Sequence, residues 1–172
     1  RSALAATPTD QRKGLTPEYR AAEGFDTSSP AVTKWREAGW LVAHVVPEKR
    51  IASGRSVTVE LSGQPAREAI LEREGWGAFS LGALGGNGYP ATRMGTAAHL
   101  RQAFLDAAHY REQAALYAAK VPEIDRPEPD RVTLALAEQL AARGPMLIAA
   151  DTRDDILRAI DFAAEHGLPA VI

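Results

Sequence analysis

The stretch that decides the fold runs from Gly144 to Ile156 and reads G-P-M-L-I-A-A-D-T-R-D-D-I. The apolar run 146–150 predicts a buried strand, and a helix is expected to begin near Thr152. Thr152 followed three residues later by Asp155 resembles a capping box, with Asp in place of the usual Glu. In α/β proteins, ligands gather at the carboxyl ends of such strands, so Asp151 stands at a candidate site.

The segments around this stretch alternate between predicted strands and helices. Apolar or alternating runs predict strands at 40–46, 56–61, 77–81 and 170–172, whereas 51–54 is expected to be a loop. Helices are expected at 30–38, 65–72, 96–120 and 132–140, and a last one ends before Gly167. This order is α/β. Because a complete barrel usually needs about 200 residues or more, we expect a partial or rearranged set of TIM-barrel-like parallel βα units.

Burial can also be predicted for three of these elements. The run Trp40–Val46 is continuously apolar, as in a strand covered on both faces. The long helix is expected to bury a stripe made of Ala97, Leu100, Phe104, Ala107, Ala108, Ala115 and Ala118. The last helix is expected to bury Ile156, Ile160, Ala163 and Ala164.

The N-terminal part differs in composition from the rest. Residues 1–30 are polar and contain turn signals such as Thr16–Pro17, which predicts an N-terminal arm that is mostly loop. Residues 31–172 are expected to form the α/β domain, as a portion of a larger barrel or a longer chain. The chain starts with Arg1, and Ser2–Ala6 lacks a preceding apolar run, so a trimmed or partial chain is favoured over a signal peptide.

Composition excludes several classes of function. Hydrophobic residues make up 45% and charged residues 24% of the 172 residues, the balance of an ordinary globular protein. The net charge of -2 gives no reason to expect nucleic acid or an anionic membrane as a partner. The absence of cysteine excludes disulfides and thiolate metal sites, but it leaves the compartment unknown.

Candidate ligand-binding residues are scattered along the chain. A glycine-rich loop at 82–88, which includes Asn87, lies between a predicted strand and Arg93 near the start of the long helix. It lacks the Gly-Lys-Ser/Thr ending of a P-loop, so a connecting loop is favoured over a phosphate site. His44 lies in a predicted strand, from which it could point into a pocket. No spacing typical of histidine metal ligands exists, and a structural role is favoured for the histidines.

Four stretches together carry a resemblance to a known family. They are P-A-T-R-M-G-T-A-A-H-L-R-Q-A-F at 90–104, A-G-W-L-V-A-H-V-V-P at 38–47, I-A-S-G-R-S-V-T-V-E-L at 51–61, and residues 145–172. In this order they resemble the imidazolonepropionase-like branch of the amidohydrolase superfamily. The resemblance implies a metal-dependent TIM barrel that hydrolyses C–N bonds of amides or cyclic amides, with zinc or a similar divalent metal as cofactor.

The same resemblance implies that metal ligands are missing. The family's metal-binding lysine falls near Ala78, its fifth-strand histidine at Ala149, and a second histidine of that motif at Asp151. Alanine has no lone pair to donate to a metal, and without a metal no activated water forms. The resemblance therefore favours a non-catalytic domain without catalytic residues, metal or cofactor, which has a structural or ligand-binding role in a larger protein.

Two alternatives remain open. The chain could belong to a working metal-dependent hydrolase whose ligands lie outside these residues. It could also be a small-molecule module that binds an anion through the 82–88 loop and Arg93. Because a partial barrel exposes strand edges and apolar surface, a homodimer or association with a catalytic amidohydrolase domain is expected.

Overall fold

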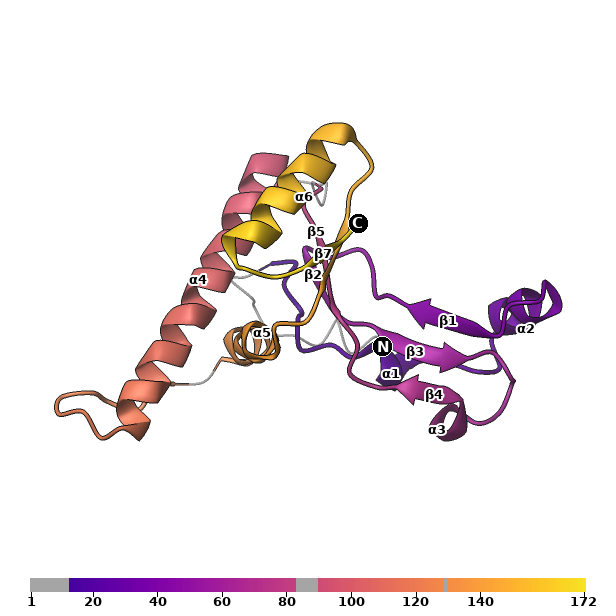
Figure 1. The fold of residues 1–172 in the computed structure, drawn as a ribbon, viewed down its shortest axis with the longest axis horizontal. Coiled ribbons are helices and arrows are strands. Elements are labelled where there is room, and N and C mark those ends of the chain that lie inside the picture. Colours follow the sequence, from indigo (N-terminus) through magenta and orange to yellow (C-terminus); the bar gives the residue numbers. More distant parts are fainter. Residues whose placement is uncertain (1–12, 83–89, 129) are drawn as a thin grey trace.

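The computed structural model describes residues 13–82, 90–128 and 130–172. Its strands form two open sheets, one of order β1-β3-β4 and one of order β2-β5-β6-β7. Figure 1 shows the long helices gathered beside the four-stranded sheet, while the three-stranded sheet extends away from them. The α/β class predicted from the sequence is thus confirmed as a mixed α/β fold.

The three-stranded sheet is antiparallel. It consists of β1 (Val42–Val45), β3 (Val57–Glu60) and β4 (Ile70–Glu72), the last preceded by the single turn of α3 (Ala66–Ala69). The alternation in β3 places Val57 and Val59 on the inner face, where both are fully buried. There they pack into a small core with residues of α1 (Ala21–Gly24) and α2 (Pro30–Glu37).

The four-stranded sheet is mostly parallel. β2 (Ala52–Arg55) pairs antiparallel with β5 (Gly77–Ser80), whereas β5, β6 (Met146–Ala149) and β7 (Ala170–Val171) run parallel. Parallel neighbours require a crossover connection. The helices α4 (Arg93–Ala118) and α5 (Arg131–Ala142) connect β5 to β6, and α6 (Arg153–Glu165) connects β6 to β7.

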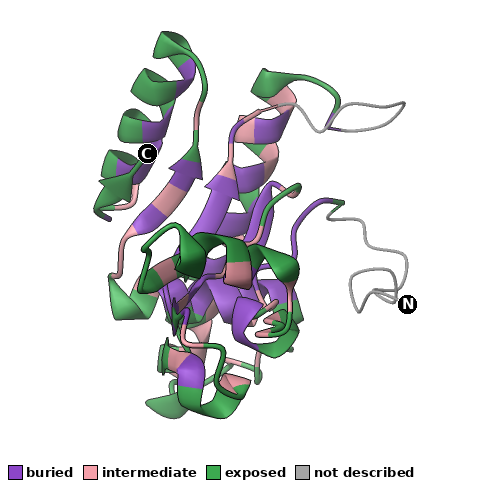
Figure 2. Cartoon of the chain, turned by 90° about the vertical axis from the view of Figure 1, so that its right-hand side faces the viewer, coloured by how far each residue is buried: buried purple, intermediate pink, exposed green. Residues whose placement is uncertain are grey.

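The larger core lies between these helices and one face of the four-stranded sheet. Phe79 and Ile148 point from the sheet into it, and Phe104 and Phe162 enter from α4 and α6. The ring of Phe104 lies 5.5 Å from that of Phe79 and 5.4 Å from that of Phe162. Full burial of one such side chain contributes roughly 1.5–3 kcal/mol. Figure 2 shows the buried residues on the inward sides of the helices and along the strands.

Two strands occupy positions where the sequence predicted other structure. Residues 51–54, predicted as a loop, form part of a buried segment that contains β2. Its residues are small because the chain near Tyr19 lies against it: a Cβ at Gly54 would stand 2.3 Å from the Tyr19 carbonyl oxygen. The helix predicted at 65–72 is one turn long, and Ile70–Glu72 pair with β3 instead. Isoleucine favours strands, and pairing with β3 outweighs helix propensity here.

The prediction that Trp40–Val46 is covered on both faces is wrong. β1 lies at the edge of its sheet, and the side chains of Trp40, Leu41 and Val42 are 58%, 76% and 47% exposed. A run of apolar residues predicts a strand but does not determine whether other strands or helices cover it. That depends on the order of the strands in the sheet.

The predicted buried faces of α4 and α6 are correct only in part. Leu100, Phe104 and Ala107 are buried in α4, but its C-terminal half extends beyond the sheet (Figure 1), so Ala108, Ala115 and Ala118 are exposed. In α6 the buried face is centred on Ala159 and Phe162. Of the residues predicted there, Ala163 is buried, whereas Ile156, Ile160 and Ala164 are exposed.

The segment before α2 packs against the rest of the protein. Leu15 is fully buried in the larger core, and the Thr16 N–H donates to the Ala52 carbonyl at 2.8 Å. Residues 1–12 lie outside the described residues. The division into an arm at 1–30 and a domain at 31–172 stays a prediction.

Candidate functional site

The carboxyl ends of β5 and β6 define the candidate site. Parallel neighbours end at the same edge of a sheet, and Ser80 of β5 is in register with Ala149 of β6. The helices that follow these strands in the chain, α4 and α6, begin with Thr92 and Thr152 as N-caps. Each threonine hydroxyl accepts from the backbone N–H three residues later, on Gly95 and Asp155 respectively.

A cavity of about 670 Å³ lies on the sheet face that the helices leave uncovered. Its floor includes Ala78, Ser80, Leu147 and Ala149 from β5 and β6, with Val171 and Ile172 beside them. The segment between β1 and β2 forms another wall with the charged residues Glu48, Lys49 and Arg50, and β2 adds the Ser53 hydroxyl. Such a cavity, apolar with a few polar groups, has the size and character of a small-molecule site.

The segment between β1 and β2 has an unusual backbone at the cavity. Lys49 has a φ of 72°, in the left-handed region that residues with side chains rarely adopt. The Ser53 hydroxyl donates to the Arg50 carbonyl and accepts from the Arg50 N–H, each at 3.2 Å. Two hydrogen bonds therefore hold the turn that presents Lys49 and Arg50 to the cavity.

The residues of β5 and β6 that line this cavity do not fit a zinc site. Ala78 and Ala149 line the same cavity, and a methyl group offers no electron pair to a metal. The Ser80 hydroxyl accepts from the Gly82 N–H at 3.2 Å. Within the described ranges, the structure contains no group of three or more His, Cys, Asp or Glu residues that could hold a metal ion.

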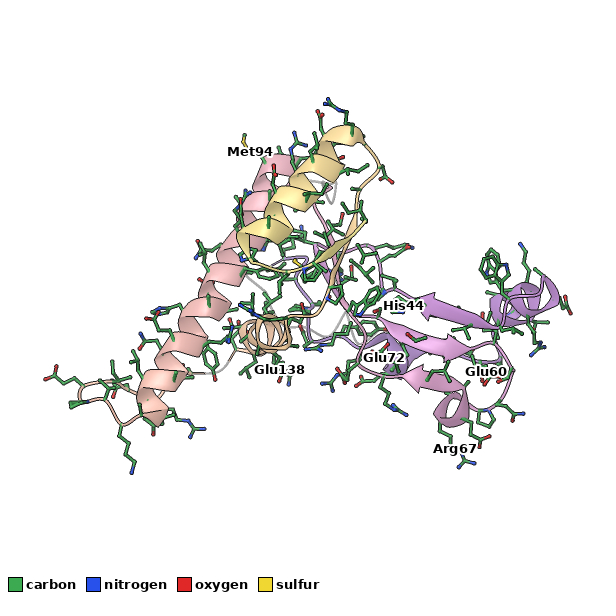
Figure 3. The ribbon with its side chains drawn as sticks, in the orientation of Figure 1. His44, Glu60, Arg67, Glu72, Met94 and Glu138 are labelled. Atoms are coloured by element: carbon green, nitrogen blue, oxygen red, sulfur yellow. The ribbon has the colours of Figure 1, made fainter. Side chains whose placement is uncertain are left out.

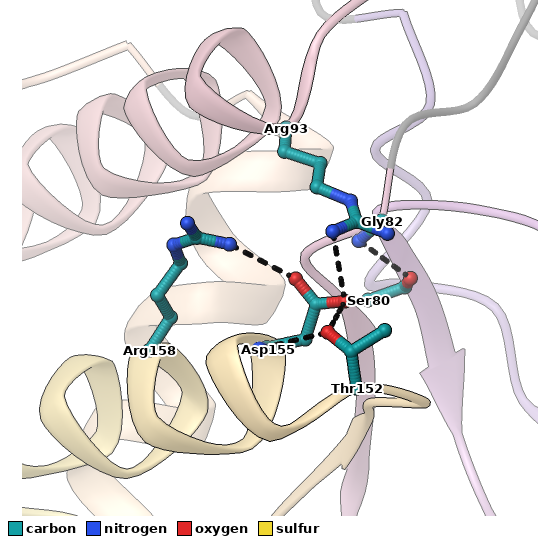
Figure 4. Close-up of polar contacts among 6 residues, drawn as sticks. All are labelled: Ser80, Gly82, Arg93, Thr152, Asp155 and Arg158. Carbon is teal, nitrogen blue, oxygen red and sulfur yellow. Dashed lines mark hydrogen bonds and ion pairs between the residues drawn. The ribbon is translucent and has the colours of Figure 1, made fainter.

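Asp155 is the carboxylate most firmly held at this end of the sheet (Figure 4). Its Oδ2 accepts from the Thr152 hydroxyl at 2.7 Å and lies 3.4 Å from Arg93 Nη1, while its Oδ1 lies 3.1 Å from Arg158 Nη1. The Thr152 hydrogen bond is the main cause of a lowered Asp155 pKa; the two arginines add to it and burial opposes it. The carboxylate is therefore charged and neutralised by its neighbours.

The predicted Thr152–Asp155 pair is only partly a capping box. Thr152 is the N-cap and accepts from the Asp155 N–H at 3.3 Å, as predicted. The Asp155 carboxylate accepts from the Thr152 side chain, whereas in a capping box it would accept from the N-cap backbone. The shorter Asp side chain, compared with Glu, explains this difference.

The three predicted site residues that the structure describes lie on different elements. His44 lies on β1, in the other sheet, where its Nδ1 is 3.0 Å from the Thr58 hydroxyl (Figure 3). Arg93 is at the start of α4 and paired with Asp155, and Asp151 is exposed after β6. Asn87 lies outside the described residues. Their proposed binding roles stay predictions.

The hydrogen bond of His44 continues across the three-stranded sheet. The Thr58 hydroxyl donates to Glu72 Oε2 at 3.2 Å, and the His44 ring lies 5.0 Å from the ring of Trp76. These contacts connect His44 to its neighbours on the exposed face of the three-stranded sheet.

Sequence reasoning missed the residues that line the cavity from the β1–β2 segment. The signal available was Glu48, Lys49 and Arg50 directly after Pro47, a charged turn between two apolar runs. The sequence pattern predicted Asp155 only as a helix-start residue. Its partner Arg93 is distant in the sequence, so the pair follows from the packing of α4 against α6.

Comparisons with known proteins give one structural relation. The chain matches no protein-family model and no curated protein. It resembles a crystal structure of an amidohydrolase from Thermotoga maritima MSB8, with a TM-score of 0.79 and 25% sequence identity over 95% of this chain. The chain spans 44% of the length of that amidohydrolase. This protein therefore resembles part of an amidohydrolase, and the imidazolonepropionase-like branch stays a prediction.

Proposed function

We propose that this chain is an amidohydrolase-like, TIM-barrel-derived unit that has lost the metal ligands and does not catalyse hydrolysis. Its role is structural or ligand-binding within a larger protein. The structural resemblance to part of an amidohydrolase supports the relationship to amidohydrolases. The proposed loss of the metal ligands rests on residues of β5 and β6 that line the cavity.

One observation carries the proposal: Ala78 and Ala149 line one cavity, at positions where the family resemblance implies metal ligands. Asp155, a carboxylate at the start of α6, is bound by Thr152 and two arginines. A carboxylate neutralised in this way is a poor candidate for holding a dication, because metal binding would have to displace two cations.

The cavity itself favours a retained binding role. It has a floor of small and aliphatic side chains, and Lys49 and Arg50 stand on its wall beside Glu48. Because the wall carries two cations and one carboxylate, the cavity favours binding of a small molecule with an apolar body and an anionic group. Lys49→Gln and Arg50→Gln together are expected to weaken such binding without changing the sheet.

Metal analysis tests the proposal. Protein purified from zinc-supplemented medium is expected to contain far less than one zinc per chain, and to hydrolyse none of a panel of amides and lactams. Zinc near stoichiometry, or hydrolysis that a chelator abolishes, would overturn the proposal.

A gain-of-ligand variant sharpens the same test. Ala149→His combined with Asp151→His places two imidazoles where the resemblance implies them, and is expected to raise zinc affinity at least tenfold. Ala150→His, which adds one imidazole between these positions, is the matched control. Equal zinc affinity in the two variants would contradict the assigned positions.

A working hydrolase whose metal ligands lie outside these residues is the second candidate. The observation in its favour is that the chain spans 44% of the matched amidohydrolase, which leaves most of that protein's length without a counterpart here. Chelator-sensitive hydrolysis that appears only when a second polypeptide is added would support this candidate over the first.

We propose that an amidohydrolase domain is the partner of this chain and that it covers the free edge of β7. Ile156, Ile160 and Val171 are exposed, and β7 is the outermost strand of the four-stranded sheet. Parallel sheets are normally covered on both faces, so a further βα unit fits this surface. Mixing with an intact amidohydrolase should yield a heteromeric complex in size-exclusion chromatography with light scattering. A homodimer alone would contradict this choice of partner.

A further inference from the structure

A second cavity lies at the opposite end of the four-stranded sheet, where β5 and β6 begin. It has a volume of about 230 Å³, and its lining includes Arg55, Glu74, Gly77, Gln139 and Met146. Gly77 and Met146 are the first residues of β5 and β6, whereas the cavity of the candidate site lies towards their last residues. The two cavities therefore belong to different ends of the same strands.

Gln139 brings an unused hydrogen-bond donor to this second cavity. Its side chain, on α5, is only 9% exposed, and among the described residues its buried Nε2 has no hydrogen-bond partner. A Cβ at Gly77 would stand 2.5 Å from Gln139 Oε1, so glycine at this position makes room for the amide. A buried amide without a partner destabilises a folded protein, which makes a ligand the natural partner for it.

Arg55 brings a second set of available donors. Its side chain is 14% exposed, and its guanidinium lies 3.7 Å from Glu74 Oε2 and 3.7 Å from Glu138 Oε2. Both distances exceed the range of a hydrogen bond. The other oxygen of Glu74 is held by Arg20 at 2.8 Å. The planar guanidinium of Arg55 can thus donate two hydrogen bonds to a carboxylate without breaking a short contact to either glutamate.

Negative groups stand beside these donors. Glu72 and Glu74 line the cavity, and so do Ala142, the last residue of α5, and Gly144 just after it. The C-terminal end of a helix carries partial negative charge and favours cations. The cavity therefore offers donors for an anionic group and acceptors for a cationic group within a small volume.

We propose that this cavity binds a small zwitterionic α-amino acid. The carboxylate lies on the Arg55 guanidinium and the Gln139 amide N–H₂, and the ammonium group points towards Glu74 and the last carbonyls of α5. The size of the cavity limits the ligand to an amino acid with a short side chain. This site is independent of the function proposed above for the carboxyl ends of the strands.

Calorimetry and thermal denaturation with glycine, L-alanine and L-serine test the proposal. At millimolar concentrations at least one of the three is expected to bind and to raise the melting temperature. Acetate and ethylamine, which each carry one of the two charges, are expected to bind at least tenfold more weakly. The proposal is overturned if none of the three amino acids binds, or if acetate binds as tightly as they do.

Two variants place the ligand on these residues. Gln139→Leu removes the unpaired amide at nearly constant size. It is expected to raise the melting temperature of the ligand-free protein and to lower amino-acid affinity at least tenfold. Arg55→Lys keeps the charge but loses the fork, and is expected to weaken binding to a similar degree.

Matched controls separate binding from general effects. Gln102→Leu changes a glutamine on the exposed side of α4, and Arg67→Lys changes an arginine on α3 that is 80% exposed; both are expected to bind the amino acid as the unmodified protein does. Unchanged amino-acid affinity in Gln139→Leu would overturn the proposal. If Arg55→Lys does not fold, the result for Gln139→Leu alone tests the proposal.

Discussion

The three-stranded and the four-stranded sheets differ in what covers them. Phe79 and Ile148 of the four-stranded sheet are buried beneath three helices, whereas the outer face of the three-stranded sheet is open and carries exposed Val42 and His44. Both sheets contain apolar strands, so the difference comes from strand order and from the helices in the crossover connections. Both cavities described above border β5 and β6 of the four-stranded sheet.

The largest effect is expected in the core beneath the four-stranded sheet. Phe104→Ala removes a ring that contacts Phe79 and Phe162, and should lower the free energy of unfolding by about 3–5 kcal/mol. Trp40→Ala removes a ring that is 58% exposed and serves as the control, with a change within about 0.5 kcal/mol. Denaturant titration measures both. Similar losses in the two variants would contradict the contrast between the sheets.

A smaller effect is expected at the start of α6. Thr152→Ala removes the N-cap hydroxyl and the shortest contact of Asp155, and should cost about 0.5–2 kcal/mol of stability. Thr152→Ser keeps the hydroxyl and should retain most of the stability. Equal melting temperatures for the alanine and serine variants would show that the cap contributes nothing.

A pH-dependent contribution to stability is expected from His166 at the end of α6. Burial is the main cause of its lowered pKa; nearby Arg101 adds to the lowering and Glu165 opposes it. Its ring packs on Phe104 and Phe162, at 4.5 and 4.8 Å between centroids. A lowered folded pKa means that the contribution is fully present above about pH 6.5, the usual histidine pKa, and is lost as the pH falls through the folded pKa.

Thermal denaturation between about pH 8 and 5 measures this contribution. His166→Leu, which keeps an apolar side chain at this position, should show a shallower decline in melting temperature than the unmodified protein. Parallel declines in the two proteins would rule out His166 as the titrating group.

The smallest effect is expected on the open face of the three-stranded sheet. His44→Ala breaks the 3.0 Å contact with Thr58, which is exposed to solvent, and should change the free energy of unfolding by no more than about 0.5 kcal/mol. It should also leave small-molecule binding at both cavities unchanged. A loss of binding would support the predicted binding role of His44.

Much of the secondary structure was predictable because its signals are local. Thr152 caps α6, Pro30 begins α2, and the alternation at 56–61 corresponds to β3 with Val57 and Val59 buried. For the candidate site, only its location at the carboxyl end of β6 was predictable. Its cavity-lining residues Lys49 and Arg50 were not, since nothing near them in the sequence indicates which strand they approach.

By itself, the sequence determined the α/β class and the types and approximate positions of most elements, because caps, turns and periodic apolar residues act over a few neighbours. Tertiary structure alone decided that there are two sheets, which strands lie at their edges, and which polar groups meet. The pairing of Arg93 with Asp155 and the approach of Gln139 to Gly77 join residues about sixty positions apart. Contacts of this kind arise from packing and leave no mark in local composition.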